Sequence, residues 1–369
     1  MVVGARSLSR LAVTDSGLRL FGCDPSATLK EILEKIRLNR LGFCLVLSGE
    51  RNLLGVVCEH EIRCFWAEGA DLATAGEIWM NSSPLTVHQG ENPNGDNRFT
   101  GLVVVPEIMS LDRKIVAVWV QKPDSLRQYT SKYLLGMVLA GGKGTRLKEH
   151  TRNLAKPLVR VSAGDTLLDL VLDGFRKSGF SEITLSVRHK KEQFFEKQSE
   201  IEKKSGLKLT FIEENEPLGT AGSLFSLEDF RSGVVISNGD VYSSFALSTF
   251  IDYSIRVDAD ICVVGTCQSQ KNEFGVLKLD SGNKLTEIVE KPVTRFLVAA
   301  GVYFASARVL EHFAPMLRGN SIDMPDFLNL VIKGGFDVRV FPIFEEWKDV
   351  GTPEVLNEVR AELLYGEEL

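Results

Sequence analysis

The sequence contains no apolar run long enough to cross a bilayer, and its first residues lack the charged-then-apolar order of a secretory signal. It also lacks a basic excess: the net charge is −6, whereas binding a nucleic acid backbone needs a basic face. The six cysteines include no Cys-x-x-Cys pair and stand mostly in apolar stretches, as free thiols of a reducing compartment do. We therefore expect a cytoplasmic protein without nucleic acid or membrane partners.

The glycine-rich segment 139–147 lacks the two common phosphate-binding patterns. No Gly-Lys-Ser/Thr closes it as in a Walker A loop, and it does not follow the Gly-x-Gly-x-x-Gly order of a dinucleotide fold. It does follow an apolar run, 134–138, that has the length of a buried parallel strand. Its glycines and the nearby basic residues are Gly141, Gly142, Gly144, Lys143, Arg146 and Lys156. Such glycines let backbone amides approach a polyphosphate, so the segment predicts an anion site, with a plain strand-to-helix turn as the alternative.

The length of 369 residues favours two domains. Residues 1–127 predict a helix over 29–36, strands at 43–47 and 53–58, and a helix over 59–66. This β-α-β-β-α order resembles the cystathionine-β-synthase (CBS) repeat, a module that usually occurs as a pair and often binds adenine nucleotides. A shortened second copy is expected at 102–106 and 114–120. It should lack its first helix, because 90–101 is rich in Gly, Asn and Asp.

The N-terminal region departs from that repeat at two positions. Cys58 and Glu61 stand where such repeats often carry Thr and Asp for a ribose. We therefore expect no tight adenine-nucleotide site in residues 1–127, and a role in packing or self-association.

Residues 133–369 form the second predicted domain, after a polar linker at 123–132. Apolar runs alternate there with helical patterns, which predicts a doubly wound, mainly parallel, Rossmann-like α/β sheet beside a smaller α+β N-terminal domain. The expected strands are 134–139, 183–187, 207–212, 234–237 and 261–266. The expected helices are 166–177, 192–204, 223–230 and 245–255. A turn at 280–283 predicts a hairpin of 276–279 with 285–289.

The glycine-rich segment, continued by Lys156-Pro157, resembles the signature of the sugar-phosphate nucleotidyltransferases, which join a sugar 1-phosphate to a nucleoside triphosphate and release pyrophosphate. Further similar segments follow in the order of that family. They are Pro217–Leu224, Asn238-Gly239-Asp240, Glu290-Lys291-Pro292, Gly301-Val302-Tyr303 and Trp347–Pro353.

The resemblance implies a role for each matching position. Catalytic residues would be Arg146, Lys156 and Lys291. The nucleotide would be bound by Leu139, Ala140, Gly141, Gly142, Gly144, Thr145, Glu214, Gly219 and Thr220. The sugar would contact Asn238, Gly239, Glu290 and Gly301, and Asp240 and Asp349 would hold Mg²⁺. No nucleophilic side chain is required, because the sugar phosphate itself can attack the α-phosphorus in line.

The two aspartates follow predicted strand and helix boundaries. Asp240 comes after the strand at 234–237, and Asp349 precedes a helix start at Thr352-Pro353. Two carboxylates that converge at one face of a sheet suit Mg²⁺, whereas the alternative is that each caps a helix. Lys156 and Lys291 each precede proline, which favours an extended backbone and a stiff segment at both lysines.

The strand that ends at Glu213-Glu214 places Glu214 where the family reads the base edge. A carboxylate accepts two hydrogen bonds and matches the paired N–H donors of guanine, which favours GTP; a solvated strand end is the alternative. Many relatives carry Asn two residues before the glycine of Gly301-Val302-Tyr303, where this chain has Ala299, so a sugar contact is lost or the sugar differs.

These residues predict an enzyme whose partners are a nucleoside triphosphate and a sugar 1-phosphate. CBS-like repeats ahead of a transferase resemble the glucosamine-1-phosphate guanylyltransferases of the legionaminic acid route. Mannose and heptose 1-phosphate remain open, as do UTP or dTTP, the oligomeric state, and a regulatory paralogue that only binds a nucleotide sugar.

Overall fold

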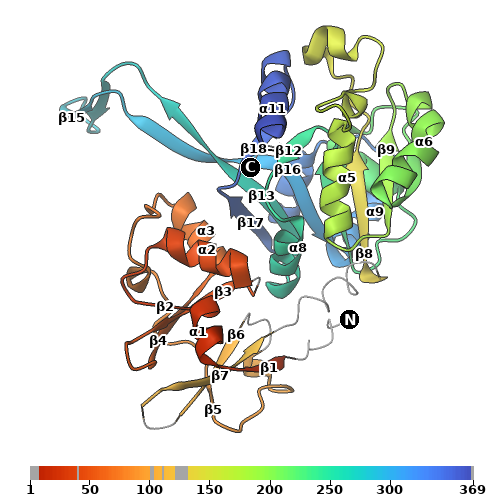
Figure 1. The fold of residues 1–369 in the computed structure, drawn as a ribbon. Coiled ribbons are helices and arrows are strands. Elements are labelled where there is room, and N and C mark those ends of the chain that lie inside the picture. Colours follow the sequence, from red (N-terminus) through yellow and green to blue (C-terminus); the bar gives the residue numbers. More distant parts are fainter. Residues whose placement is uncertain (1–7, 40, 100–103, 110–111, 121–131, 367–369) are drawn as a thin grey trace.

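The computed structural model describes residues 8–39, 41–99, 104–109, 112–120 and 132–366. A seven-stranded sheet with the order β10-β9-β8-β11-β16-β13-β17 organises the C-terminal part (Figure 1). Its strands are β8 (Leu134–Leu139), β9 (Glu182–Val187), β10 (Lys208–Glu213), β11 (Gly233–Asn238), β13 (Ile261–Lys271), β16 (Val293–Ser306) and β17 (Val338–Ile343). Neighbours pair in parallel, except that β16 runs antiparallel to β11 and β13. The mainly parallel sheet is confirmed.

Helices cover both faces of this sheet because successive side chains of its strands point to opposite sides. Val138 lies in the core under α5 (Leu167–Lys177), α6 (Glu192–Ser205) and α8 (Leu247–Arg256). Met137, its neighbour, lies in the second core, under α9 (Ala307–Leu317) and α10 (Met324–Lys333). The doubly wound arrangement is therefore confirmed.

The C-terminal helix α11 (Pro353–Gly366) packs elsewhere. Its Leu356 and Val359 join a small core with Leu147 and Leu167, beside the glycine-rich segment and the start of α5. The end of the chain thus supports the same region as the predicted anion site.

One predicted helix is wrong. Residues 223–230 are not helical throughout: they begin with a 3-10 turn, η5 (Ser223–Ser226), which directly follows the short helix α7 (Gly219–Gly222). The backbone at Leu227 is extended, which ends the helical conformation after Ser226. Strands β16 and β17 had no sequence prediction. The burial of β16 changes from exposed to buried midway, so no single period marks it.

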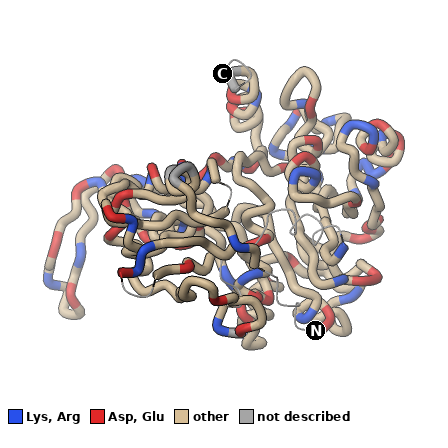
Figure 2. The backbone as a smooth tube through the Cα atoms, turned by 60° about the horizontal axis from the view of Figure 1, so that its bottom comes forward, with Lys and Arg blue, Asp and Glu red and all other residues tan. Residues whose placement is uncertain are grey.

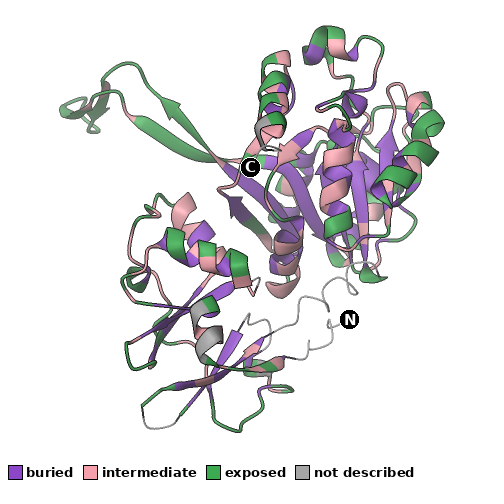
Figure 3. Cartoon of the chain, in the orientation of Figure 1, coloured by how far each residue is buried: buried purple, intermediate pink, exposed green. Residues whose placement is uncertain are grey.

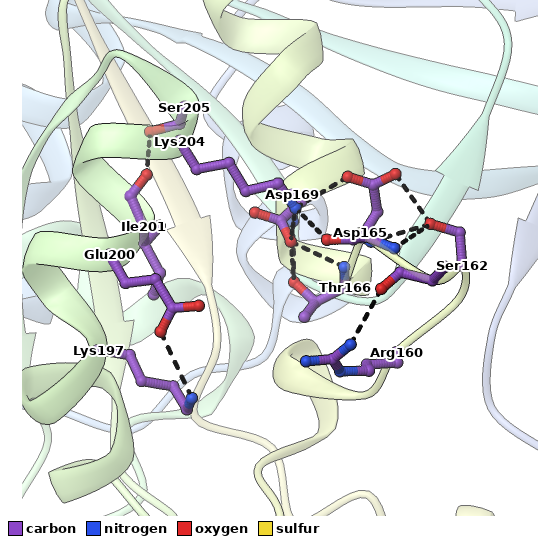
Figure 4. A network of polar contacts seen from close by, with 12 residues as sticks. Arg160, Ser162, Asp165, Thr166, Asp169, Lys197, Glu200, Ile201, Lys204 and Ser205 are labelled. Atoms are coloured by element: carbon purple, nitrogen blue, oxygen red, sulfur yellow. Dashed lines mark hydrogen bonds and ion pairs between the residues drawn. The ribbon is translucent and has the colours of Figure 1, made fainter.

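A polar network secures the N-terminus of α5 (Figure 4). Lys204 of α6 donates to Asp165 and Asp169, each at 2.8 Å, and Asp169 accepts the backbone amide of Thr166 at 2.8 Å. The hydrogen bond from Lys204 lowers the pKa of Asp165, so this carboxylate is ionised at neutral pH. The network joins α6 to the segment that leads from the glycine-rich loop into α5.

The N-terminal part contains the predicted β-α-β-β-α order. It consists of β2 (Gly22–Cys23), α2 (Leu29–Asn39), β3 (Phe43–Leu47), β4 (Leu53–Cys58) and α3 (Glu59–Ala67). A second sheet has the order β1-β7-β6-β5, from β1 (Ser9–Ala12), β5 (Val87–His88), β6 (Val104–Ile108) and β7 (Ile115–Val120). Helix α1 (Asp15–Phe21) and the 3-10 turn η1 (Gly76–Ile78) complete this part.

The sequence predicts no helix over residues 90–101. Of the described residues between β5 and β6, only the 3-10 turn η2 (Asn97–Phe99) is helical. Most of the predicted linker, 123–131, lies outside the described residues. Within the part of the chain that the structure describes, no helix combines the length and apolar composition needed to cross a membrane.

Helix α3 joins the N-terminal part to the edge strand β17. Arg63 binds Glu345 through two hydrogen bonds of 2.5 and 2.6 Å, and its Nη2 also donates to Glu59 at 2.5 Å. Its guanidinium lies 4.8 and 4.4 Å from the ring centroids of Phe341 and Phe344. The Arg63 side chain is only 3% exposed. Its buried charge is therefore balanced by Glu59 of the N-terminal part and by Glu345 of the C-terminal part.

Candidate functional site

The glycine-rich loop begins where β8 ends. The carbonyl of Leu139 accepts the amide of Gly239, and the amide of Ala140 donates to Ser186, so β8 is held between β11 and β9. Gly144 has φ +64°, and a Cβ there would lie 2.9 Å from the Cβ of Lys156. This glycine therefore allows the loop to close over Lys156.

Four predicted residues meet at this loop. Lys156, which begins the 3-10 turn η4 (Lys156–Leu158), has its ammonium against Asp240 and 3.7 Å from Oδ1 of Asp349. Arg146 approaches Oδ2 of Asp349 at 3.4 Å. The Lys156 side chain is 8% exposed, so its charge is aimed at the two carboxylates rather than at solvent.

A two-stranded sheet aligns the two aspartates. Strand β12 (Val241–Ser243) pairs with β18 (Trp347–Asp349), with Val241 opposite Asp349, and the amide of Val350 donates to the carbonyl of Asp240. Neither aspartate caps a helix, because Ala246 precedes α8 and the Thr352 hydroxyl accepts an amide of α11. The capping alternative is therefore wrong.

The donor set fits a hard divalent cation. Both carboxylates contact one ammonium and hence lie close together, and Mg²⁺ in proteins is commonly held by one or two carboxylates plus phosphate oxygens and water. Among the described residues, no group of three or more His, Cys, Asp or Glu side chains is arranged for a metal. Asp240 and Asp349 would accordingly need ligand oxygens to complete an octahedron.

Glu214 faces the glycine-rich loop, whereas Glu213 does not. The Glu214 carboxylate accepts the Ser186 hydroxyl and, at 3.3 Å, the amide of Leu218, and a Cβ on Gly141 would lie 3.3 Å from its Oε1. Glu213 is exposed and pairs with Lys191 at 2.9 Å. The protein therefore fixes the orientation of Glu214, and each of its oxygens keeps a further lone pair for a ligand.

The predicted Gly219-Thr220 segment is tied to the start of α10. The amide of Thr220 donates to Asp323 at 3.0 Å, and its hydroxyl accepts the amide of Met324 at 2.7 Å. In β16, Gly301 has φ +75°, and a Cβ there would lie 2.6 Å from Nδ2 of Asn238, the last residue of β11. Asn238, Gly239 and Gly301 are thus brought together beside Asp240.

Replacing Gly219 with Ala is expected to destabilise the protein by roughly 1–3 kcal/mol, because φ is +75° and the new Cβ would lie 2.4 Å from the carbonyl oxygen of Ile322. Urea denaturation would measure this. Gly174→Ala is the matched control, since that glycine lies in α5 with open space around it and should lose no stability. Equal midpoints for the two variants would contradict the expectation.

A basic hollow of about 370 Å³ adjoins the loop, and most of its lining residues were not predicted from the sequence. It is lined by Lys143, Thr145, Lys148, Glu149, Thr151, Arg152, His189 and Lys190. Lys190 donates to the carbonyls of Thr151, Arg152 and Leu154, and thereby holds the segment before Lys156. Partial burial and nearby positive charge lower the pKa of His189. The available signal was the basic run 188–191, which directly follows β9.

Lys291 and Glu290 are not brought to this cluster. They follow β15 (Leu285–Val289), which pairs with β14 (Val276–Leu279) at the end of an exposed arm (Figure 3). The extended backbone expected before proline is also wrong at both lysines. Lys291 has φ +45°, and Lys156 starts a 3-10 turn.

A nucleotidyl transferase family model matches residues 135–365, a span that contains every residue of the cluster. The chain belongs to this family. The mannose-1-phosphate guanyltransferases of Yarrowia lipolytica and Saccharomyces cerevisiae are each 30% identical to it, over 227 and 231 residues. Each match covers 59% of this chain and 61% or 62% of the relative. The chain thus spans about three-fifths of the length of these curated relatives.

Among solved structures, HddC from Yersinia pseudotuberculosis is 26% identical to this nucleotidyl transferase family member, with a TM-score of 0.48. The match covers 63% of this chain and 99% of that chain.

Proposed function

We propose that the chain transfers a guanylyl group from GTP to a sugar 1-phosphate in the cytoplasm, releasing pyrophosphate and a GDP-sugar. The observation that carries the proposal is the convergence of Arg146, Lys156, Asp240 and Asp349 at the end of a glycine-rich loop, inside the family match. This intact set speaks against the alternative of a regulatory paralogue that only binds a nucleotide sugar.

The reaction needs position and charge rather than a protein nucleophile. A phosphate oxygen of the sugar 1-phosphate attacks the α-phosphorus in line, and the bond to the β-phosphate oxygen breaks as pyrophosphate takes the electron pair. Arg146, Lys156 and the amides of the glycine-rich loop would hold the triphosphate and neutralise the charge that develops. Mg²⁺ held by Asp240 and Asp349 would polarise the phosphate oxygens.

Two observations support GTP over UTP or dTTP. The relatives at 30% identity are named mannose-1-phosphate guanyltransferases. Glu214 presents an oriented carboxylate beside Gly141, where it can accept from the paired N–H groups of guanine.

Replacing Glu214 with Gln is expected to reduce the preference for GTP over UTP by about 5- to 150-fold, because a mismatched hydrogen bond costs on the order of 1–3 kcal/mol. The ratio of kcat/KM for the two nucleotides measures the effect. Glu213→Gln is the control, since Glu213 points to solvent and pairs with Lys191. Unchanged selectivity in the Glu214 variant would show that other residues read the base.

For the sugar we favour glucosamine 1-phosphate, with mannose and heptose 1-phosphate as alternatives. The resemblance of the N-terminal region to CBS repeats ahead of a transferase supports this choice, and Ala299 in place of the frequent Asn argues that the sugar differs from that of many relatives. Pyrophosphate release, measured across GTP, UTP and dTTP against these three sugar phosphates, tests the proposal. No release from any pair would overturn it.

We further propose that the CBS-like region serves packing and binds no adenine nucleotide tightly. Glu61 already accepts the amide of Cys58 at 2.9 Å at the start of α3, so its carboxylate is engaged within the protein. The same helix carries Arg63 into the contact with β17.

A further inference from the structure

Beyond the seven-stranded sheet, β13 and β16 continue as a two-stranded arm that carries the β14–β15 hairpin. Their pairing runs from Gly265 opposite Ala299 to Lys271 opposite Val293. At about 3.3 Å per residue, the strand from Gly301 to Val293 spans roughly 25 Å. The arm leaves the body of the molecule in both views (Figures 1 and 2), and most of its residues are exposed (Figure 3).

The hairpin at the end of the arm has one apolar face and one face that carries an ion pair. On the apolar face, Leu277 lies opposite Ile288 and Leu279 opposite Leu285, and these four side chains are 47–59% exposed. On the other face Lys278 and Glu287 form an ion pair of 2.7 Å.

Such an arm needs a covering surface. A two-stranded hairpin is marginally stable alone in water, and a contiguous exposed apolar face marks an interaction site. Phe274, at the start of the hairpin, is 78% exposed and enlarges the apolar surface.

The motif at the base of the hairpin indicates what covers it. Lys291 makes no ion pair with any residue that the structure describes, and it lies at the far end of β16 from Gly301 and Asn238. The Arg146 and Asp349 side chains are 67% and 43% exposed, so the site is open to an incoming group.

Another copy of this chain offers both an open site that lacks this lysine and an identical apolar hairpin. In a closed two-fold dimer, one type of interface would both cover the apolar hairpin of each copy and bring Lys291 of each copy to the site of the other. The arm also supplies about 30 residues, which is the size of one side of a standard interface.

We propose that two copies of this chain exchange arms. The apolar face of each hairpin is then buried against the other copy, and Lys291 of each copy binds the sugar phosphate in the site formed by Asp240 and Asp349 of the other. This inference rests on the proposed function, together with the catalytic role that the family resemblance implies for Lys291.

A mixed dimer tests the exchange. Asp240→Asn and Lys291→Ala chains are co-expressed with different tags, and the dimer that contains both is isolated by two affinity steps. Each parent dimer should be nearly inactive, whereas the mixed dimer should recover about half of the wild-type turnover, because one of its two sites has Asp240 and receives Lys291 from the other copy. A mixed dimer as inactive as its parents, or a fully active Lys291→Ala parent, would overturn the proposal.

Light scattering provides a readout that does not depend on catalysis. The wild-type chain should be a dimer at micromolar concentration, and the double variant Leu277→Ser, Ile288→Ser should be a folded monomer by circular dichroism. The control, Lys278→Ser with Glu287→Ser, changes the polar face and should remain a dimer. A monomeric wild type, or a dimeric Leu277/Ile288 variant, refutes arm exchange. If the wild type is a dimer but releases no pyrophosphate, the proposed function fails on its own.

Discussion

Replacing Asp349 with Asn should lower turnover by at least about 100-fold while leaving the unfolding temperature almost unchanged. Metal-mediated charge stabilisation is worth several kcal/mol, and each 1.4 kcal/mol or so corresponds to a factor of ten in rate. The side chain is 43% exposed, and its ion pairs with Lys156 and Arg146 are long, at 3.7 and 3.4 Å, so folding depends little on its charge. Pyrophosphate release at saturating Mg²⁺ and calorimetry measure the two effects.

Asp240→Asn should lose a similar amount of activity and also lose stability. Asp240 is the closer partner of Lys156, whose side chain is 8% exposed, and removing one partner of a buried pair leaves an uncompensated charge. Asp173→Asn is the control for both variants, because Asp173 pairs with Arg176 and Lys177 on the exposed face of α5. Full activity of the Asp349 variant without added metal would refute the assignment.

Replacing Arg63 with Ala should lower the free energy of unfolding by about 3–5 kcal/mol, the usual cost of removing one partner of a buried charged network. Glu345 and Glu59 would face each other across the interface without their shared cation, and Phe341 and Phe344 would lose the guanidinium that lies over their rings. Chemical denaturation, followed by fluorescence and by far-UV circular dichroism, measures the loss.

Two further substitutions give this prediction its controls. Arg63→Lys keeps the charge but not the planar fork, and should fall between the wild type and the Ala variant. Arg98→Ala removes an exposed pair with Asp96 and should cost less than about 1 kcal/mol. If the Arg63→Ala and Arg98→Ala proteins were equally stable, the contact between α3 and β17 would contribute little to the free energy of unfolding.

The parts of the fold that obey one local period were predictable. The strand at 134–139 is a continuous apolar run, and the helix at 29–36 has apolar residues at helical spacing. The structure confirms both elements. The helix predicted at 223–230 is wrong because the 3-10 turn ends at Ser226 and the backbone is extended at Leu227. The apolar side chains of this segment are all buried in the core under α9 and α10, so tertiary packing rather than a helical period determines its backbone.

The candidate site likewise contains residues that could be placed from the sequence and residues that could not. Positions next to strand ends, such as Asp240 and Glu214, could be placed from the sequence because the sheet brings the carboxyl ends of its strands to one edge. Lys291 could not, since its location depends on how far β13 and β16 extend beyond the sheet. The hydrogen bonds from Lys190 to three carbonyls could not be predicted from the sequence either, because they form only where the fold brings two loops together.

The pairing of β12 with β18 has a consequence for biosynthesis. Asp240 belongs to the middle of the family domain, whereas Asp349 is among its last residues, and their alignment depends on Val241 lying opposite Asp349. During synthesis the glycine-rich loop and Asp240 leave the ribosome well before the strand that completes the carboxylate pair. A chain interrupted before Trp347 would therefore retain the glycine-rich loop but only one carboxylate of the pair.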